Sequence, residues 1–239
     1  MRRFLKSPTG IVLLLLLAVS FMNRGLSDPK TYFYDMLVSL PGIIIGLSFH
    51  EFGHAFVSSK LGDPTPRMQG RVTLNPLAHI DPFGFLALVF CGFGWGIPVQ
   101  IDPRYYKHPR RDELLVSVAG VTMNLLLAIA FSFVAHVMVV LMPGKLVKGT
   151  LPGILFYIIM EIVIINLVLM ICNLIPVPPL DGFGIITQLF NLRQTKLYDQ
   201  VYRNGYIILM VLLMTGVVGR ILSPAVNAIY SLLFEHIVL

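Results

Sequence analysis

Two histidines and a glutamate stand close together in an otherwise apolar stretch of the chain. His50, Glu51 and His54 form an H-E-x-x-H element. On a helix, residues i and i+4 lie on one face, so both imidazoles can bind a single Zn²⁺ while Glu51 reaches a water on the metal. Zinc lowers the pKa of such a water to about 7, and a carboxylate can take its proton as the water attacks a peptide carbonyl. The spacing therefore predicts peptide hydrolysis, with Glu51 as the general base.

A catalytic zinc takes three protein ligands and leaves its fourth position to water, so one further donor is required. Asp181 is the best candidate, because it ends a proline-rich segment, residues 173–182, that follows a long apolar stretch. Prolines break a helix, and broken backbone at membrane depth is tolerated only where protein or a water-filled cavity satisfies it. We therefore predict that His50, His54 and Asp181 hold one Zn²⁺ per chain.

Other donors are weaker candidates for the third ligand. Glu161 lies in the middle of an apolar stretch, about three helical turns before Asn173, and is too far from the expected depth. His79 could approach the site from a loop, but capping a turn is the simpler role for it. The remaining histidines and both cysteines show no metal-type spacing: His108, His136, His236, Cys91 and Cys172.

Two asparagines lie within apolar stretches and could contact a substrate. An amide near the metal can hold the substrate carbonyl or the developing oxyanion, which preorganised donors stabilise strongly. We predict this substrate-binding role for Asn173 and Asn124. For Asn124, which ends the G-x-x-x-N element at residues 120–124, packing between helices is the alternative.

The composition indicates an all-α polytopic membrane protein. The chain is 56% hydrophobic and 13% charged, with a mean hydropathy of +0.81, whereas a soluble surface needs roughly a quarter of residues charged. We predict membrane spans in the apolar stretches near residues 10–22, 35–57, 114–142, 151–174 and 206–221. We expect about five to six transmembrane helices. Residues 10–22 could instead be a cleaved signal peptide, and residues 224–239 an interfacial helix or half span.

The distribution of basic residues predicts the orientation. With the amino terminus in the cytoplasm, 13 of the 18 Lys and Arg residues are cytoplasmic and 4 are external, as the positive-inside rule requires. The metal site then faces the cytoplasmic side of a prokaryotic plasma or inner membrane. The net charge of +6 follows this pattern and gives no support to a nucleic-acid partner.

Between the second and third apolar stretches we expect irregular structure near the active site. Residues 83–99 are apolar but interrupted by glycines, with basic residues on both flanks, which predicts a re-entrant segment. Residues 71–74 read as a strand of a short β-hairpin, which could pair with an unwound substrate.

With these motifs the chain resembles the site-2 protease family of intramembrane metalloproteases, peptidase family M50. The resemblance rests on the H-E-x-x-H element, the G-x-x-x-N element at residues 120–124 and the N-x-x-P-x-x-x-x-D-G element at residues 173–182. It implies zinc ligation by His50, His54 and Asp181, a general base at Glu51 and substrate contact by Asn173. It also implies one metalloprotease domain over residues 1–239, since neither a PDZ nor a CBS domain is recognisable.

Two functions of different classes follow from these observations. The first is a zinc endopeptidase that cuts single-span membrane proteins within the lipid bilayer, with access limited by the helix bundle or by a regulatory membrane partner. The second is a catalytically silent membrane scaffold, or a metal transporter, that uses the same ligands. A transporter would be expected to line a continuous path with polar residues, and the apolar stretches carry few.

Overall fold

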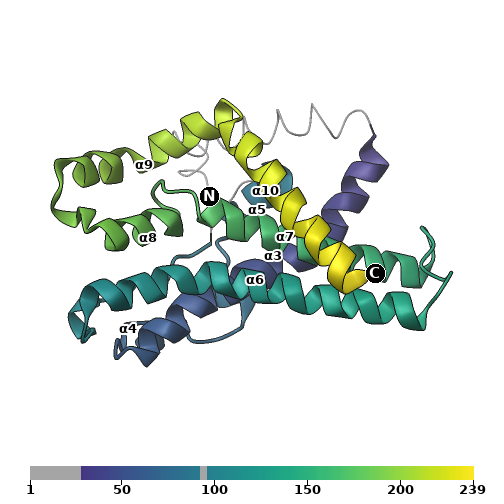
Figure 1. Ribbon diagram of the computed structural model, residues 1–239, viewed down its shortest axis with the longest axis horizontal. Helices are drawn as coiled ribbons and strands as arrows, with labels where there is room; N and C mark the ends of the chain where they lie inside the picture. Colours follow the sequence, from purple (N-terminus) through teal and green to yellow (C-terminus); the bar gives the residue numbers. More distant parts are fainter. Residues whose placement is uncertain (1–27, 92–95) are drawn as a thin grey trace.

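The computed structural model describes residues 28–91 and 96–239, and this part of the chain is helical, without strands (Figure 1). The prediction of an all-α protein is confirmed. Within these residues, four stretches are long and apolar enough to cross a membrane: α3 (Pro29–Lys60), α6 (Pro109–Leu141), α7 (Leu151–Asn173) and Val217–Val238. The last of these joins α10 (Val217–Leu233) to a π-helical turn, η5 (Phe234–Val238).

Three of the long helices, α3, α6 and α7, pack against one another and form the centre of the molecule. α10 crosses α7 on the outside (Figure 1). The apolar core joins α6, α7 and α10 through side chains such as Ala128, Leu167 and Val226, which are 0%, 0% and 7% exposed. Close packing of small and branched side chains is what holds helices together in lipid, where there is no hydrophobic drive between them.

α7 is terminated by the proline-rich segment that follows it. Its start is fixed by Thr150, whose hydroxyl accepts a hydrogen bond from the N–H of Gly153 at 3.2 Å, and it ends at Asn173. A turn then leads into α8 (Asp181–Phe190), which is followed by η4 (Leu192–Gln194) and α9 (Lys196–Met214). The first residue of the short helix α8 is therefore Asp181, at the end of the bundle.

The predicted span at residues 206–221 is wrong. α9 ends at Met214 and α10 begins at Val217, because Gly216 adopts a left-handed conformation with φ of 71° and interrupts the helix. The stretch that is long and apolar enough to span is Val217–Val238 instead, so most of residues 224–239 belong to a longer helical stretch and do not form a segment of their own. The predicted span at residues 10–22 lies outside the described residues.

The predicted β-hairpin is also wrong. Residues 71–74 contain a bend at Val72 and Thr73 and no strand, and the described loop contains a single isolated antiparallel bridge, between Ile80 and Gly96. The hydrogen bonds of Thr73 explain this difference. Its carbonyl accepts from the Nε2–H of His79 at 2.7 Å, and its hydroxyl accepts from the N–H of Asn75 at 3.2 Å. These local bonds curl the chain into η2 (Pro76–Ala78) and replace a β ladder.

Part of the predicted re-entrant segment is helical. α5 (Pro82–Cys91) has 10 residues, about 15 Å of helix, which is half the thickness of the hydrocarbon core. Beyond the gap in the described residues, the N–H of Ile97 donates to the carbonyl of His79 at 2.7 Å, and the N–H of Val99 donates to Glu51 on α3. The re-entrant course of residues 83–99 stays a prediction.

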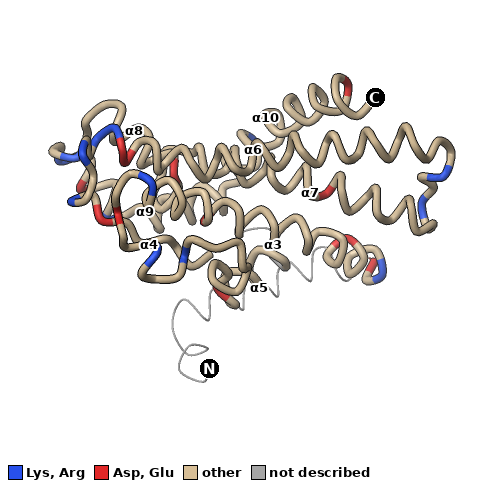
Figure 2. The backbone as a smooth tube through the Cα atoms, turned by 90° about the horizontal axis from the view of Figure 1, so that it is seen from below, with Lys and Arg blue, Asp and Glu red and all other residues tan. Residues whose placement is uncertain are grey.

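The charged residues gather at the two ends of the long helices, and the middle of the bundle is almost free of them (Figure 2). The end that carries α4 (Thr65–Met68), α8 and the start of α9 is rich in Lys and Arg. Such a distribution is typical of a helical membrane protein.

Candidate metal centre

The two predicted histidine ligands lie on one face of α3. Their side chains are buried, with 6% of His50 and 9% of His54 exposed, and their Nε2 atoms are 3.2 Å apart. The four-residue spacing is the cause, because residues i and i+4 of an α-helix stand above one another. α3 therefore presents two ring nitrogens to one point inside the protein.

Asp181 brings its carboxylate to the same point from α8. Its Oδ2 atom lies 3.3 Å from Nε2 of His50 and 3.2 Å from Nε2 of His54. The neighbouring Gly182 makes this possible, because a Cβ at that position would overlap the carbonyl group of Leu174 at the end of α7. In the part of the chain that the structure describes, these three predicted ligands form a group able to hold a metal ion.

Hydrogen bonds at the second nitrogen of each ring fix its tautomer. Nδ1 of His54 lies 2.8 Å from the main-chain oxygen of Val116, and a carbonyl only accepts, so this nitrogen carries the proton. Nδ1 of His50 lies 2.7 Å from Oδ1 of Asn124, which accepts because the amide nitrogen of Asn124 donates elsewhere. In its neutral form each ring therefore holds its lone pair on Nε2, the atom that faces Asp181.

With both imidazoles neutral, three atoms with lone pairs converge on one point, and this arrangement favours a bound cation. Oδ2 of Asp181 is buried and has no hydrogen-bond partner, which is costly unless a positive charge faces it. Two imidazolium rings would not serve, because they would place like charges at His50 and His54, whose Nε2 atoms are 3.2 Å apart. Two imidazoles and one carboxylate fit zinc, and they leave its fourth position open.

Gly120 on α6 makes room for the histidine pair. A Cβ added at this position would overlap Nε2 of His54 and would lie 2.6 Å from Cε1 of His50. Asn124 follows one turn later on the same helix and contacts His50. The G-x-x-x-N element therefore has a physical explanation: its glycine admits the imidazoles and its asparagine orients one of them.

Glu51 lies next to His50 on α3, beside the returning loop after α5. Its Oε2 atom accepts a hydrogen bond from the main-chain N–H of Val99, with 3.2 Å between nitrogen and oxygen. The side chain is half-buried. Among the described residues, Val99 is the one donor given for its carboxylate. A carboxylate held in this way, adjacent to the paired imidazoles, is placed to accept a proton from water.

The loop that contacts Glu51 is anchored by Asp63, a buried carboxylate with 1% exposure. Asp63 accepts hydrogen bonds from the hydroxyl of Ser58 at 2.8 Å and from the main-chain N–H groups of Thr65 at 2.9 Å and Asp102 at 2.8 Å. Burial raises the pKa of this carboxyl, but the hydrogen bonds outweigh burial and hold the pKa below its usual value. Since Asp102 is three residues beyond Val99, this anchor fixes the loop near Glu51.

The two predicted substrate-binding asparagines occupy different environments. Asn173 is half-buried at the end of α7, and its amide nitrogen donates to the carbonyl of Leu169 at 3.0 Å. Asn124 is 0% exposed, and its amide is bonded to His50, Gly46 and Asn166. The geometry favours a role in holding His50 over contact with a substrate for Asn124.

Sequence reasoning missed Asn166, which is also 0% exposed. A signal was present, because Asn166 is a neutral amide in the same apolar stretch as Asn173 and precedes it by seven residues, or two helical turns. The other donors considered lie elsewhere in the described structure. Nε2 of His79 donates to Thr73, and Nδ1 of His136 lies 3.1 Å from the main-chain oxygen of Val238.

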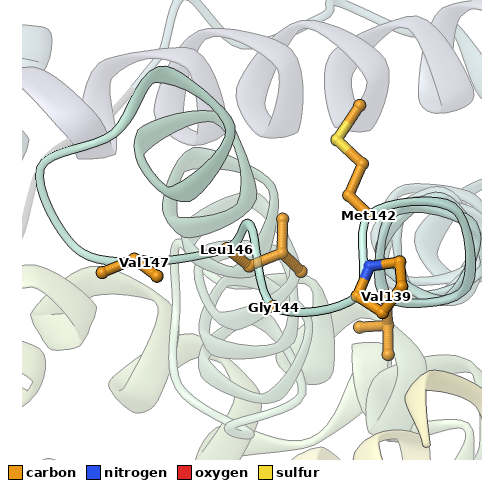
Figure 3. A pocket seen from close by; sticks show the side chains of 6 residues that line it. Val139, Met142, Gly144, Leu146 and Val147 are labelled. Atoms are coloured by element: carbon orange, nitrogen blue, oxygen red, sulfur yellow. The ribbon is translucent and has the colours of Figure 1, made fainter.

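A separate cavity of about 350 Å³ lies in the loop between α6 and α7 (Figure 3). It is lined by Val139, Met142, Pro143, Gly144, Leu146 and Val147. None of these side chains ionises or ligates zinc, and the loop lies at the opposite end of the bundle from α8 (Figure 1). This cavity therefore has no part in the chemistry of the metal centre.

A buried pair of histidines, an aspartate from a second helix and a neighbouring glutamate, all within a bundle of membrane-length helices, define a metallopeptidase-type centre. Comparisons with known proteins agree with this class. Residues 145–216, which include Asn173 and Asp181, match the family model described as Peptidase family M50.

Two relatives extend the similarity to the H-E-x-x-H half of the chain. YwhC of Bacillus subtilis is 36% identical over 212 residues, which cover 87% of this chain and 92% of YwhC. Rip2 of Mycolicibacterium smegmatis is 28% identical over 216 residues, covering 85% of this chain and 76% of Rip2. Both are named as candidate zinc metalloproteases.

No solved structure matches the chain significantly. The chain belongs to peptidase family M50, the zinc metalloproteases of the site-2 protease type.

Proposed function

We propose that this protein is an intramembrane zinc endopeptidase, which hydrolyses peptide bonds within or near the transmembrane segments of single-span membrane proteins. The convergence of His50, His54 and Asp181 inside a bundle of membrane-length helices carries this proposal. Groups of this kind are expensive at membrane depth and are retained there for function.

In this proposal His50, His54 and Asp181 hold one zinc ion per chain. Bound zinc would supply a Lewis acid that polarises the scissile carbonyl and makes a water acidic enough to be activated at neutral pH. Glu51 accepts the proton of the attacking water and passes it to the leaving amine. The hydrogen bond from Val99 orients the Glu51 carboxylate for this transfer.

Asn173 is the candidate contact for the substrate carbonyl. Its amide nitrogen donates to Leu169 within its own helix, and an amide has two N–H groups, so one remains to bind a substrate oxygen. Its position at the end of α7, directly before the turn that leads to Asp181, supports this role. A donor there would stabilise the oxyanion of the tetrahedral intermediate.

The orientation follows from the charges at the two ends of the bundle. Ten of the described Lys and Arg residues belong to the end of α3, α4, the start of α6, η4, the first half of α9 or the loops beside them: Lys60, Arg67, Arg71, Arg104, Lys107, Arg110, Arg111, Arg193, Lys196 and Arg203. These segments lie at the end of the bundle that carries α4 and α8 (Figure 2). Three lie at the opposite end: Lys30, Lys145 and Lys148. We therefore place the protein in a bacterial plasma or inner membrane with the α8 end, and access to the active site, on the cytoplasmic side.

The test is cleavage of a panel of single-span substrates by protein reconstituted in liposomes. Glu51→Gln should retain zinc and lose cleavage, because it removes the base and keeps the ligands. His54→Ala should lose both zinc and cleavage. Glu235→Gln, which changes an exposed glutamate far along the chain, should behave as wild type. Normal turnover by Glu51→Gln would exclude the mechanism, and zinc uptake into the liposomes without cleavage would favour a transporter.

A further inference from the structure

The buried amide of Asn166 continues the hydrogen-bonded chain that begins at His50. Asn166 on α7 is 0% exposed, and so is Asn124 on α6. The amide nitrogen of Asn124 donates to Oδ1 of Asn166 at 2.9 Å, and Oδ1 of Asn124 meets Nδ1 of His50 at 2.7 Å. Three membrane-length helices are thus linked at one depth through two neutral side chains.

The bond from Asn166 to Ile162 determines which group donates and which accepts in each hydrogen bond between Asn166, Asn124 and His50. The amide nitrogen of Asn166 donates to the main-chain carbonyl of Ile162 at 2.8 Å, and a carbonyl only accepts. Oδ1 of Asn166 must then face Asn124 as an acceptor, so the amide group of Asn124 turns its nitrogen toward Asn166. A second N–H of Asn124 donates to the carbonyl of Gly46 at 3.1 Å, which requires the same orientation.

The consequence reaches the metal side of His50. With its nitrogen committed to two acceptors, Asn124 can offer only Oδ1 to the imidazole, and Nδ1 must carry the proton. In the neutral ring the lone pair is then on Nε2, 3.3 Å from Oδ2 of Asp181. The opposite tautomer would place an N–H against the metal position and could not bind a cation.

We infer that Asn166 is a positioning residue for the metal centre, which sets the tautomer and ring orientation of His50 through Asn124. This inference rests on the proposed zinc site and adds a residue that neither ligates the metal nor touches its ligands. Partners behind a ligating histidine typically change metal affinity by about 10- to 100-fold. Asn166 acts one residue further away, so its removal should weaken zinc binding by about 10-fold.

The test measures zinc dissociation constants by competition with a chromophoric chelator in purified, detergent-solubilised protein. The variants are Asn124→Leu, Asn166→Leu and the double variant, with Asn227→Leu as the control, since Asn227 is an exposed asparagine in α10. If Asn166 acts through Asn124, the double variant should bind zinc as Asn124→Leu does. Independent structural contributions would instead multiply.

A second readout separates tautomer control from general loosening. In Co²⁺-substituted protein, the Nδ1 protons of His50 and His54 should give two paramagnetically shifted exchangeable signals. Asn166→Leu should broaden the His50 signal through faster exchange and leave the His54 signal unchanged. Should Asn166→Leu fail to fold, Asn166→Thr keeps a hydroxyl that can bond to Ile162 but cannot reach Asn124, and should have the same effect.

The outcomes separate this inference from the proposed function. Wild-type protein that does not bind zinc would overturn both. Tight zinc binding by wild type together with unchanged affinity in Asn166→Leu, or with multiplying effects in the double variant, would overturn the role of Asn166 alone.

Discussion

The two halves of the metal centre are held in place by different chemistry. His50 and His54 are fixed inside the bundle by neutral groups, namely the amides of Asn124 and Asn166 and the carbonyl of Val116. Such bonds are shielded from solvent and ions. The histidine half therefore belongs to the rigid, apolar part of the molecule.

Asp181 depends instead on a charged clamp at the far end of α8, formed by Arg110 and Glu113 of α6 with Gln188 and Arg193. Arg110 donates to the carbonyls of Gln188 at 2.6 Å and Leu189 at 2.7 Å. Glu113 accepts from Gln188 at 2.7 Å and from Arg193 at 2.8 Å. The side chain of Arg193 is 53% exposed and that of Glu113 is 8% exposed.

The comparison suggests that the histidine half is preformed and that the aspartate half completes the site. Arg110 also caps the last carbonyl groups of α8, which helix geometry leaves unpaired. α8 is thus tied to α6 at one end, while its other end carries the ligand. Changes in either half should lower zinc affinity, and the loss should be larger for the histidine half than for the clamp that holds α8.

The largest effect is expected for Gly120→Ala, which fills the space that the imidazoles occupy. The added methyl group would overlap His54, and a close-packed interior cannot move enough to accommodate it. Zinc affinity should fall on the order of 100-fold or more. Isothermal titration or chelator competition measures this change. Gly219→Ala is the matched control, because an added Cβ meets nothing within 4 Å there, and wild-type affinity of Gly120→Ala would refute the packing argument.

A smaller effect is expected for Glu113→Gln, which breaks the charged clamp. Gln188 would lose an acceptor and Arg193 its counter-ion, so α8 would be held less firmly against α6. Zinc affinity should fall about 10-fold, as for other residues behind a ligand. The same chelator competition applies, with Glu235→Gln as the exposed control. A loss of zinc affinity as large as that of Gly120→Ala would contradict the distinction between a preformed histidine half and a more loosely held aspartate half.

Removal of zinc should loosen the two halves unequally. After chelation, hydrogen–deuterium exchange should increase in residues 174–190, which include α8, because the carboxylate of Asp181 loses the cation that it shares with the histidines. Exchange in residues 46–54 of α3 should change little, since the amide network and the backbone helix remain. Equal exchange increases in both segments would remove the distinction between them.

The smallest effect is expected from salt. Raising NaCl from 0.1 to 0.5 M should weaken zinc binding less than about 3-fold, because screening reaches the half-exposed Arg193 and spares the buried amides. In Arg193→Ala the ion pair with Glu113 is absent, so NaCl should change zinc affinity only through its direct effect on the metal ion. A salt dependence that is unchanged in Arg193→Ala would place its origin outside the clamp.

The sequence predicted the parts of this structure that depend on local patterns. The H-E-x-x-H spacing places His50 and His54 together on any helix, and long apolar stretches specify α3, α6 and α7. The meeting of these histidines with Asp181 was predicted from the proline-rich turn, and the structure has this geometry.

The remaining errors concern features that depend on tertiary contacts or on a single residue. The bonds of Thr73 prevented a hairpin, although the residue types favour a strand. One left-handed glycine, Gly216, divided an apolar stretch that reads as continuous. The link between Asn124 and Asn166 joins two helices, and no spacing within either helix reveals which amides will meet.

The central claim is that His50, His54 and Asp181 share one zinc ion through two imidazole nitrogens and a carboxylate oxygen. X-ray absorption spectroscopy of the purified protein, with metal content measured on the same sample, tests this directly. We predict one zinc per chain with nitrogen and oxygen neighbours at about 2.0–2.1 Å, and loss of that zinc in Asp181→Ala. A zinc with sulfur neighbours, or full occupancy retained in Asp181→Ala, would contradict the account.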